Sequence, residues 1–527
     1  MINKIIRLSS TIWYLKPTQL FYQIIFRLKR RRTLVDYSQD FNSEHVNLLR
    51  FKKVETVEKT YYGDGKFRFL NLDIQFGNVI EWDEMRYGKL WNYNLQYANW
   101  LAQRDISVNV RLGLIQSLYD SLRGGLLELE PYPASLRIIN VIKFLSNEKC
   151  INNDVIASLY SEMHFLFRNI EFHILGNHLL ENAFALVMGG SFFGKEQWIE
   201  KGTSLVMTEL KEQIHEDGAH FELSPMYHKI ILFRVLEFID WYSHASTFDD
   251  NVLYEVQRVA GLMISWLNKI SFRNGKIPNF NDSAEGIAFP TNWLFDYALN
   301  DLGIKKMDVP LKDSGYRSVS KALYECKLDL AQISSSYQPG HGHSDALAFI
   351  LFYKEKPLFV EQGTSTYQRG KRRDLERSTE AHNTVVVNNT SQSQVWGGFR
   401  VGNRAKVRIL VDEENEFKAE HDGYRKEFGI IHNRHFLFKN DKIELFDFLS
   451  KPFNSMCYFH LFPGLFANQV DESRFLINNE VEAVFRGASK IELESYQYTD
   501  RFNNYQSAQR FVIHFSQELN SHFIFPN

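Results

Sequence analysis

The stretch VIASLYSEMHFLFRNIEFHIL, residues 155–175, places apolar residues three and four positions apart. This spacing puts them on one face of a helix with 3.6 residues per turn, so it predicts an amphipathic α-helix. The same period continues on both sides, from about Leu90 to about Leu302, with short polar joints between the segments. Because strand-like alternation is almost missing there, we predict an all-α array of paired, wrapping helices.

After about Gly315 the apolar residues form short alternating or β-branched runs, as in NTVVVNN (383–389) and HFLFKNDKIELFDFL (435–449). Alternation places every second side chain on one face of a strand. Asn440 and Asp441 lie inside the second run, where a hairpin turn is needed. We therefore predict a second domain of antiparallel strands stacked as a sandwich.

The chain of 527 residues is too long for one ordinary core. We predict an α+β multidomain protein in three parts: a basic helical appendage over residues 1–80, an α/α domain over 81–315 and an antiparallel β-sandwich over 316–527. The joint between the last two is placed only to within several residues.

Composition excludes some functions. The net charge of -2 gives no overall positive field of the kind that nucleic-acid binders use, so we expect no nucleic-acid partner. The aromatic share of 15% is high, and aromatic rings are natural platforms for sugars. Three widely spaced cysteines do not form a disulfide framework, which favours a reducing compartment.

The N-terminal segment is apolar and basic. Lys16 and Pro17 interrupt it before the apolar core of a signal peptide could form, and no stretch reaches the length of a membrane span. Residues 24–28 lead into Lys-Arg-Arg-Arg at 29–32. Two interpretations stay open: a helix packed on the next domain, or peripheral contact with an anionic membrane. Either way we expect a cytoplasmic location; the sequence does not indicate an oligomeric state.

Polar residues gather in a few short motifs. If GNHLLENA continues as helix, Asn177, His178 and Glu181 lie close together on it and offer an amide, an imidazole and a carboxylate to one cleft. Ser-Pro in SPMYH predicts a helix start, which places Tyr227 in a first turn. A tyrosine there can exchange a proton with a glycosidic oxygen. Capping and packing are the alternative roles for these residues.

The motif PGHGHSDALAF brings His341 and His343 to the start of a strand. One imidazole can face a substrate while the other binds a metal. His343, Glu361 and His382 form a His, Glu, His set suited to one divalent metal, with zinc the best match, and no organic cofactor is expected. Hydrogen-bonded histidines at a domain interface are the alternative.

Taken in order along the chain, these motifs resemble the heparinase II/III family of polysaccharide lyases. The motifs that carry the resemblance are KLWNYNLQYANWL, EPYPASLRIIN, GNHLLENA, DGAHFELSPMYH, IPNFNDSAEG, PGHGHSDALAF, HNTVVVNNTSQSQVWGGFR and FHLFPG. The resemblance implies an incomplete α/α toroid followed by an antiparallel β-sandwich, with the cleft between the two domains. It also implies an acidic polysaccharide or oligosaccharide as the partner, cleaved beside a uronic acid by β-elimination.

Residue roles follow from the same resemblance. Asn177 or His178 neutralises the substrate carboxylate with Glu181 nearby, Tyr227 is the acid or base, and His341 is catalytic. His343, Glu361 and His382 are the implied metal ligands, although the family usually has an aspartate followed by Pro-Gly at the middle position. For further substrate contacts we expect Arg137, Arg400 and Trp396, since guanidinium groups bind carboxylates or sulfates and indole rings stack on sugars.

Two alternatives to a lyase stay open. The missing leader makes the chain resemble family members associated with surface-polysaccharide synthesis, so a non-catalytic or differently catalytic protein of capsule or O-antigen synthesis is one alternative. A glycoside hydrolase using Asp217 and Glu222 is the other, because α/α toroids also host hydrolysis by paired carboxylates.

Overall fold

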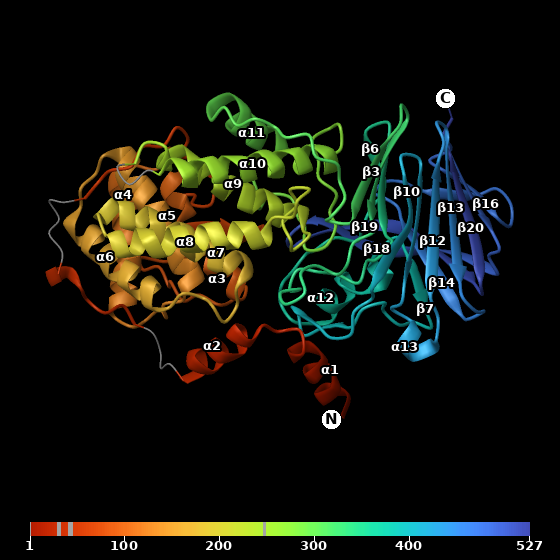
Figure 1. The fold of residues 1–527 in the computed structure, drawn as a ribbon, viewed down its shortest axis with the longest axis horizontal. Coiled ribbons are helices and arrows are strands. Elements are labelled where there is room, and N and C mark those ends of the chain that lie inside the picture. The colour runs from red at the N-terminus through yellow and green to blue at the C-terminus, as the bar shows by residue number, and fades with distance from the viewer. Residues whose placement is uncertain (1, 29–32, 41–45, 246–248, 527) are drawn as a thin grey trace.

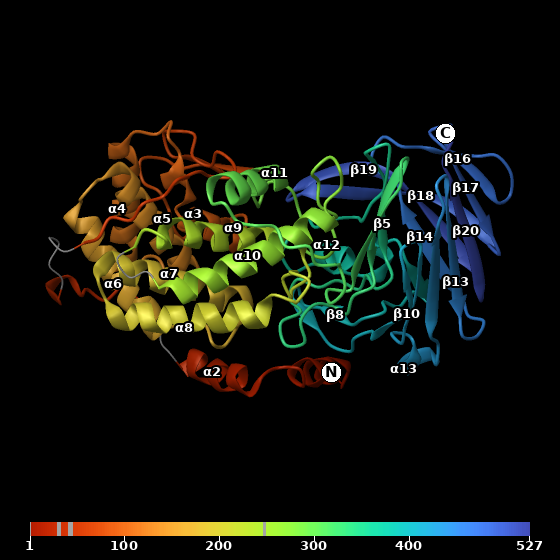
Figure 2. The same ribbon diagram turned by 45° about the horizontal axis from the view of Figure 1, so that its top comes forward.

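The computed structural model describes residues 2–28, 33–40, 46–245 and 249–526. An α/α toroid and an antiparallel β-sandwich lie side by side, and the two N-terminal helices run along one side of both domains (Figure 1). The second view shows the same order of parts (Figure 2). The fold class predicted from the two apolar periods is therefore confirmed.

Helices dominate the first half of the chain. Consecutive or near-consecutive helices pack against one another, with α5 on α7, α7 on α8 and α9 on α10. The α-helices of the described residues are α1 (Ile2–Ile12), α2 (Pro17–Leu28), α3 (Lys89–Gln96), α4 (Val108–Arg123), α5 (Pro131–Glu148), α6 (Asn153–Arg168), α7 (Gly176–Phe193), α8 (Glu196–Gln213), α9 (Pro225–Tyr242), α10 (Asp250–Ile270), α11 (Thr291–Phe295), α12 (Lys371–Glu376) and α13 (Arg425–Phe428).

The close contact between α7 and α8 depends on a glycine. A Cβ added at Gly202 on α8 would lie 2.7 Å from Cγ2 of Val187 and 2.9 Å from the carbonyl oxygen of Ala183, both on α7. Backbone atoms cannot retreat from such a contact without moving the helix. The small residue therefore sets the distance between the helix that carries Asn177 and its neighbour.

The segment before α3 differs from the predicted helical appendage. Residues Lys66–Phe69 and Leu72–Gln75 pair as the antiparallel strands β1 and β2. Their inward side chains, Phe67 among them, are buried in the core of the helical domain beside Trp91 and Trp100. Residues 66–75 therefore belong to the helical domain, and the appendage is shorter than residues 1–80. The sequence did not reveal the hairpin, because alternation over only four residues per strand is too short to recognise.

The second half is built from antiparallel pairs. One sheet has the order β10-β11-β12-β13-β20-β17-β16-β15, a second the order β18-β19-β14-β7 and a third the order β3-β4-β5-β6. The strands are β3 (Tyr316–Ser320), β4 (Tyr324–Asp329), β5 (Phe349–Tyr353), β6 (Lys356–Phe359), β7 (Val385–Val387), β8 (Val395–Trp396), β9 (Arg400–Val401), β10 (Val407–Glu413), β11 (Glu416–His421), β12 (His432–Phe438), β13 (Lys442–Leu449), β14 (Ser455–His460), β15 (Ala467–Gln469), β16 (Arg474–Ile477), β17 (Val481–Arg486), β18 (Lys490–Arg501), β19 (Asn504–Phe515) and β20 (Glu518–Ile524).

The core of the sandwich lies between the eight-stranded sheet and the two four-stranded sheets. Along β12 every second residue is buried, so one face of the large sheet turns inward. There Phe436 of β12 and Phe523 of β20 meet Phe349 of β5, and Phe523 also meets Phe359 of β6 and Phe459 of β14. Burial of these large rings stabilises the stacked sheets.

Within the described ranges, no helix combines the length and apolar content that crossing a bilayer requires.

The packing at Gly202 generates a stability prediction. We expect Gly202→Ala to lower the free energy of unfolding by about 1–3 kcal/mol, because the added methyl group collides with α7. Gly113→Ala is the matched control: it lies within α4 and its added Cβ meets nothing within 4 Å. That change should raise stability by about 0.5–1 kcal/mol through helix propensity. Urea unfolding followed by circular dichroism compares the two, and equal effects would contradict the assigned helix contact.

Candidate active site

Tyr227 lies in the first turn of α9, as its Ser-Pro motif predicted. The side chain of Ser224 caps the helix by accepting a hydrogen bond of 3.2 Å from the amide of Tyr227, and Pro225 occupies the first helical position. Both features fix where the helix begins. The phenol is thereby held at the end of α9 that faces the β-sandwich domain.

The ring of His341 stacks on that of Tyr227, with centroids 3.9 Å apart and planes inclined by 29°. The hydroxyl of Tyr367, on the sandwich side of the chain, donates to the hydroxyl of Tyr227 over 3.4 Å. Burial, followed by the effect of Tyr367, raises the pKa of Tyr227 well above its usual value. Tyr227 is therefore protonated at neutral pH, ready to donate rather than to accept.

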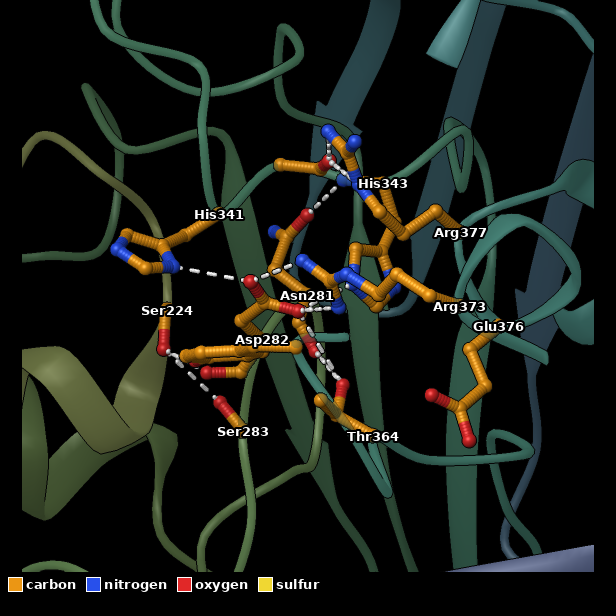
Figure 3. A network of polar contacts seen from close by, with 12 residues as sticks. Ser224, Asn281, Asp282, Ser283, His341, His343, Thr364, Arg373, Glu376 and Arg377 are labelled. Atoms are coloured by element: carbon orange, nitrogen blue, oxygen red, sulfur yellow. Dashed lines mark hydrogen bonds and ion pairs between the residues drawn. The ribbon is translucent and has the colours of Figure 1, made fainter. Parts of the chain in front are cut away.

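Asp282 is the centre of the polar contacts around His341 (Figure 3). Its carboxylate lies 2.9 Å from Nδ1 of His341 and 2.8 Å from Nε2 of His343, and Arg373 contacts both of its oxygens. Burial raises the pKa of Asp282, but Arg373 and the two histidines outweigh it and hold the pKa well below its usual value. Asp282 is therefore an ionised acceptor.

The ionised state of Asp282 fixes the proton on His341. Because a carboxylate can only accept, Nδ1 of His341 must donate to it. In the neutral ring the lone pair then lies on Nε2, which is the form that a base requires. The same argument makes Nε2 of His343 a donor to Asp282. One buried aspartate thus sets the tautomers of two histidines.

The loop containing Asp282 also joins the two histidines to α9. Ser224 donates to the carbonyl of Asp282 over 2.6 Å, and the amide of Asp282 donates to the carbonyl of His341 over 3.0 Å. The side chain of Asn281 accepts from the amide of His343 over 2.6 Å. Residues from the cap of α9, the loop after α10 and the loop after β4 are therefore held in one piece.

Left-handed backbone conformations occur next to each of these elements. Leu175, which precedes α7, has φ 65°, Leu223, which precedes the cap of α9, has φ 55°, and Asn281 has φ 55°. Asparagine accepts this region readily, whereas a leucine there is strained by about 1–3 kcal/mol. Such strain is tolerated where surrounding contacts determine the backbone, and here it precedes the residues expected to act on a substrate.

His178 and Asn177 start α7, as the sequence placed them. His178 stacks on Tyr132 with centroids 4.1 Å apart, and its Nδ1 lies 3.2 Å from the carboxylate of Glu171. Burial lowers the pKa of His178, but Glu171 and further carboxylates outweigh it, so the pKa is raised overall. Glu171 therefore favours a positively charged imidazole beside the amide of Asn177, a suitable pair for an anion at a helix N-terminus.

Glu222 lies between the start of α7 and His341. Its carboxyl accepts from the backbone N–H of Asn177 over 3.5 Å and lies 3.6 Å from Nε2 of His341. Burial is the largest effect on its pKa, which is raised. Asp217, its expected partner in a hydrolase, instead accepts hydrogen bonds from the amides of Lys312 and Ser314. Asp217 thus anchors the chain at the domain joint, and the two carboxylates do not form a hydrolytic pair.

A cavity of about 220 Å³ lies beside this cluster. Its walls come from both domains, with Tyr227 and Glu181 from the helices and Tyr367 and Phe502 from the sandwich side. The remaining aromatic residues that line it are Phe69, Tyr97, Tyr132, Phe233 and Phe289. Such a cavity, which combines aromatic rings with many polar and charged side chains, is suited to bind a sugar-sized ligand.

The face of α5 that lines the cavity excludes Arg137. Leu136, Asn140 and Lys143 are spaced by four and three residues and share the cavity face. Arg137 points elsewhere and is fully buried, where it pairs with Glu162. The expectation that Arg137 contacts substrate is therefore wrong for this structure, because its guanidinium has no surface to offer.

Trp396 and Arg400 lie outside the cavity lining on the short β8–β9 pair. The guanidinium of Arg400 lies 4.8 Å from the centroid of Trp396, and the indole Nε1 donates to the hydroxyl of Thr11 on α1 over 3.2 Å. The indole thus contacts the N-terminal helix, and neither residue contributes to the site as it stands in this structure.

Glu181, by contrast, is part of the cavity wall. Its Oε2 accepts from Nε of Arg234 over 2.8 Å, whereas its buried Oε1 has no hydrogen-bond partner among the described residues. Burial raises the pKa of Glu181 more strongly than Arg234 lowers it. An unsatisfied buried oxygen on a cavity wall is suited to bind a hydroxyl group of a ligand.

Two protein-family models match this chain: "Heparinase II/III N-terminus" over residues 138–293 and "Heparinase II/III-like, C-terminal" over residues 304–523. Together they cover most of both domains. The chain belongs to the heparinase II/III-like family.

Relatives of known activity are similar over part of their length. A heparin-sulfate lyase of Bacteroides stercoris is 25% identical over 298 residues, which are 51% of this chain and 44% of that protein. Another, of Pedobacter heparinus, is 25% identical over 241 residues, 41% of this chain and 36% of that protein. The chain thus matches less than half the length of these relatives. A solved heparinase III has a TM-score of 0.64 at 15% identity, with 96% of this chain and 88% of that chain covered, which shows a common fold.

The family resemblance also implied a metal held by His343, Glu361 and His382, but in this structure these side chains contact protein groups instead. Nδ1 of His382 pairs with Glu361, and Nε2 of His343 is bound to Asp282. Within the part of the chain that the structure describes, no three histidine, cysteine, aspartate or glutamate residues are grouped to hold a metal ion. The metal therefore stays a prediction, and the mechanism below uses none.

Several residues of the site were not predicted from the sequence. Asp282 lies in the motif IPNFNDSAEG, for which no role was predicted. Glu171, Tyr367 and Arg373 were not predicted as site residues. Asn-Asp-Ser at 281–283 predicts only an ordinary loop, so the sequence carries no specific signal for Asp282. Arg373 follows two other basic residues in KRRD and looks like part of a solvated face, although it is fully buried.

We predict that Asp282→Asn lowers the free energy of unfolding at pH 7 by about 3–5 kcal/mol, because it leaves Arg373 buried without a counter-charge. The folded pKa of Asp282 lies below its usual 3.8, so its stabilisation is present above that pH and is lost as pH falls further. The deficit of the variant should therefore shrink in acid.

Urea unfolding at pH 7 and at several pH values from about 4 down to about 2 measures this difference, because the stabilisation is lost only below the usual pKa of 3.8. Asp64→Asn is the control, because Asp64 is exposed and asparagine also tolerates its φ of 46°. A deficit that stays constant with pH would argue against an ionised Asp282.

Proposed function

We propose that this chain is a polysaccharide lyase that cleaves a uronic-acid-containing acidic polysaccharide by β-elimination. The observation that carries the proposal is the stack of Tyr227, which lines the aromatic cavity, on His341, whose Nδ1 is held by the ionised Asp282. The similarity to two heparin-sulfate lyases supports the same reaction class.

Elimination requires the uronate carboxylate to be neutralised first, since its charge keeps the neighbouring C5 proton from leaving. Asn177 and His178 begin α7, where the helix N-terminus favours an anion. Because Glu171 favours the charged form of His178, the imidazolium can donate to one carboxylate oxygen while the side-chain amide of Asn177 donates to the other. These groups lower the charge that must build up on the substrate.

The proton transfers are divided between the stacked rings. Nε2 of His341 takes the proton from C5, and the electron pair of the C5–H bond forms the C4–C5 double bond as the C4–O bond breaks. Tyr227, kept protonated by burial, donates its proton to the departing oxygen. Glu222, 3.6 Å from Nε2, stabilises the imidazolium that results. Water is not consumed, so the product carries a new unsaturated end.

The cavity charges favour a substrate with few or no sulfate groups. Among the described residues that line it, the basic side chains are Arg68, Lys143 and Arg234. Arg68 lies 3.5 Å from Asp73, Lys143 pairs with Glu237, and Arg234 pairs with Glu181. Since each cation already has a carboxylate, a sulfate group would have to enter without its own counter-charge.

Tyr227→Phe tests the proton donor. We expect turnover of a uronate polymer to fall by at least about a hundredfold, because the proton donor is lost while the stacked ring remains. The rise in far-ultraviolet absorbance from the new double bond measures turnover. Tyr254→Phe, on an exposed part of α10, is the control and should match wild type. Full activity of Tyr227→Phe would refute its role, and a saturated product would instead favour hydrolysis.

A matched pair of uronate polymers, with and without sulfate groups, tests the substrate class. We expect kcat/KM to be about tenfold or more higher for the unsulfated polymer, because the paired cations offer sulfate no free partner. Initial rates of absorbance increase give both values. A clear preference for the sulfated polymer would contradict the charge argument but not the elimination mechanism.

A further inference from the structure

The two N-terminal helices present an apolar surface to solvent. Four side chains are largely exposed: Trp13 by 85%, Phe21 by 60%, Ile24 by 61% and Leu28 by 78%. Leu8, Ile12 and Leu20 are exposed to a smaller degree on the same two helices and their joint. Single exposed apolar residues are normal, but seven large ones within 21 residues form a surface that water disfavours.

The opposite side of these helices is already docked on the toroid. On α2, Gln19 donates to the carbonyl of Ile174 over 3.0 Å, and Gln23 donates to the carbonyl of His173 over 3.1 Å. Tyr22 packs on Phe172 with ring centroids 5.0 Å apart. These contacts fix how α2 is rotated about its axis, so Phe21, Ile24 and Leu28 are held outward.

The joint and α1 are docked on the sandwich side. The amine of Lys16 lies 4.0 Å from the ring centroid of Tyr337, and the guanidinium of Arg404 lies 3.8 Å from that of Tyr14. Thr11 accepts from Trp396. The helix pair therefore contacts both domains, as its course along both of them shows (Figure 2). In this arrangement its apolar side faces away from the protein.

The charge of this segment is opposite to that of the rest of the chain. Residues 1–35 contain eight lysines and arginines and no aspartate or glutamate. Since the whole chain has a net charge of -2, residues 36–527 carry a net charge of -10. Arg7 and Arg27 are exposed on the described helices. The basic residues 29–32 lie outside the described residues and are counted by sequence alone.

We propose that α1 and α2 form a docking surface for an anionic lipid bilayer. The aromatic and aliphatic side chains would enter the boundary between headgroups and acyl chains, while the arginines pair with lipid phosphates. A second copy of the chain fits this surface less well. A two-fold interface would place the basic segment against itself, and like charges oppose that contact.

Docking through a helix pair that contacts both domains would fix the orientation of the whole molecule on the bilayer. The chain would then act on polymers held near a membrane surface. This inference does not depend on the elimination chemistry, because binding to lipid requires neither Tyr227 nor His341.

The test is co-sedimentation of the full-length chain with vesicles of phosphatidylcholine alone or with about 30% phosphatidylglycerol. We expect binding to the anionic vesicles to be at least about tenfold tighter and to weaken as salt increases. The triple change Trp13→Ser, Phe21→Ser and Ile24→Ser should reduce binding to anionic vesicles at least about tenfold. Arg7→Gln with Arg27→Gln should reduce the preference for anionic lipid.

A matched triple change separates a local surface from general apolar character. Val79→Ser, Leu126→Ser and Tyr254→Ser remove side chains exposed by 75%, 69% and 66% in the toroid domain, and should leave vesicle binding unchanged. Circular dichroism checks that each variant is folded. Equal binding of wild type and the helix variant would overturn the proposal. So would a wild-type dimer in sedimentation velocity that the helix variant converts to monomer, since a second copy would then cover the surface.

Discussion

The buried ion pair between Asp282 and Arg373 is the contact on which the site depends. Asp282 belongs to the loop after α10, whose neighbour Phe280 is in the helical core, and Arg373 belongs to α12 on the sandwich side. Removing two charges from water is costly, and the contact is stable only because both carboxylate oxygens also receive imidazole donors. One interaction thereby joins the domains and orients His341.

The fold could be predicted from periodicity because long helices and alternating strands repeat their signals many times. The hairpin β1–β2 escaped because each of its strands has only four residues, too few to separate alternation from chance. Tyr227 could be placed in a first turn because serine and proline at a helix start have local physical causes. Local rules thus reached as far as single elements.

Contacts between elements were harder to foresee. Arg137 was chosen for its chemistry, yet its rotation on α5 turns it to Glu162 rather than to the cavity, and only tertiary packing decides which face of a buried helix meets a cleft. Trp396 was chosen as a sugar platform, whereas its indole contacts α1 from nearly 400 residues earlier. Arg373 carries a charge that ordinary burial preferences place at the surface. Its position is understood only with Asp282 in view.

The stacked pair of Tyr227 and His341 has a consequence for how a polymer could be processed. Each ring is fixed by a different part of the chain, and Nε2 of His341 carries the lone pair only while Asp282 accepts from Nδ1. A separation of the domains wide enough to release a long polymer would also break the contact of Asp282 with Arg373 or with the imidazole of His341. Bond cleavage would then be confined to the closed arrangement of the domains, and the open arrangement that releases a polymer would be inactive.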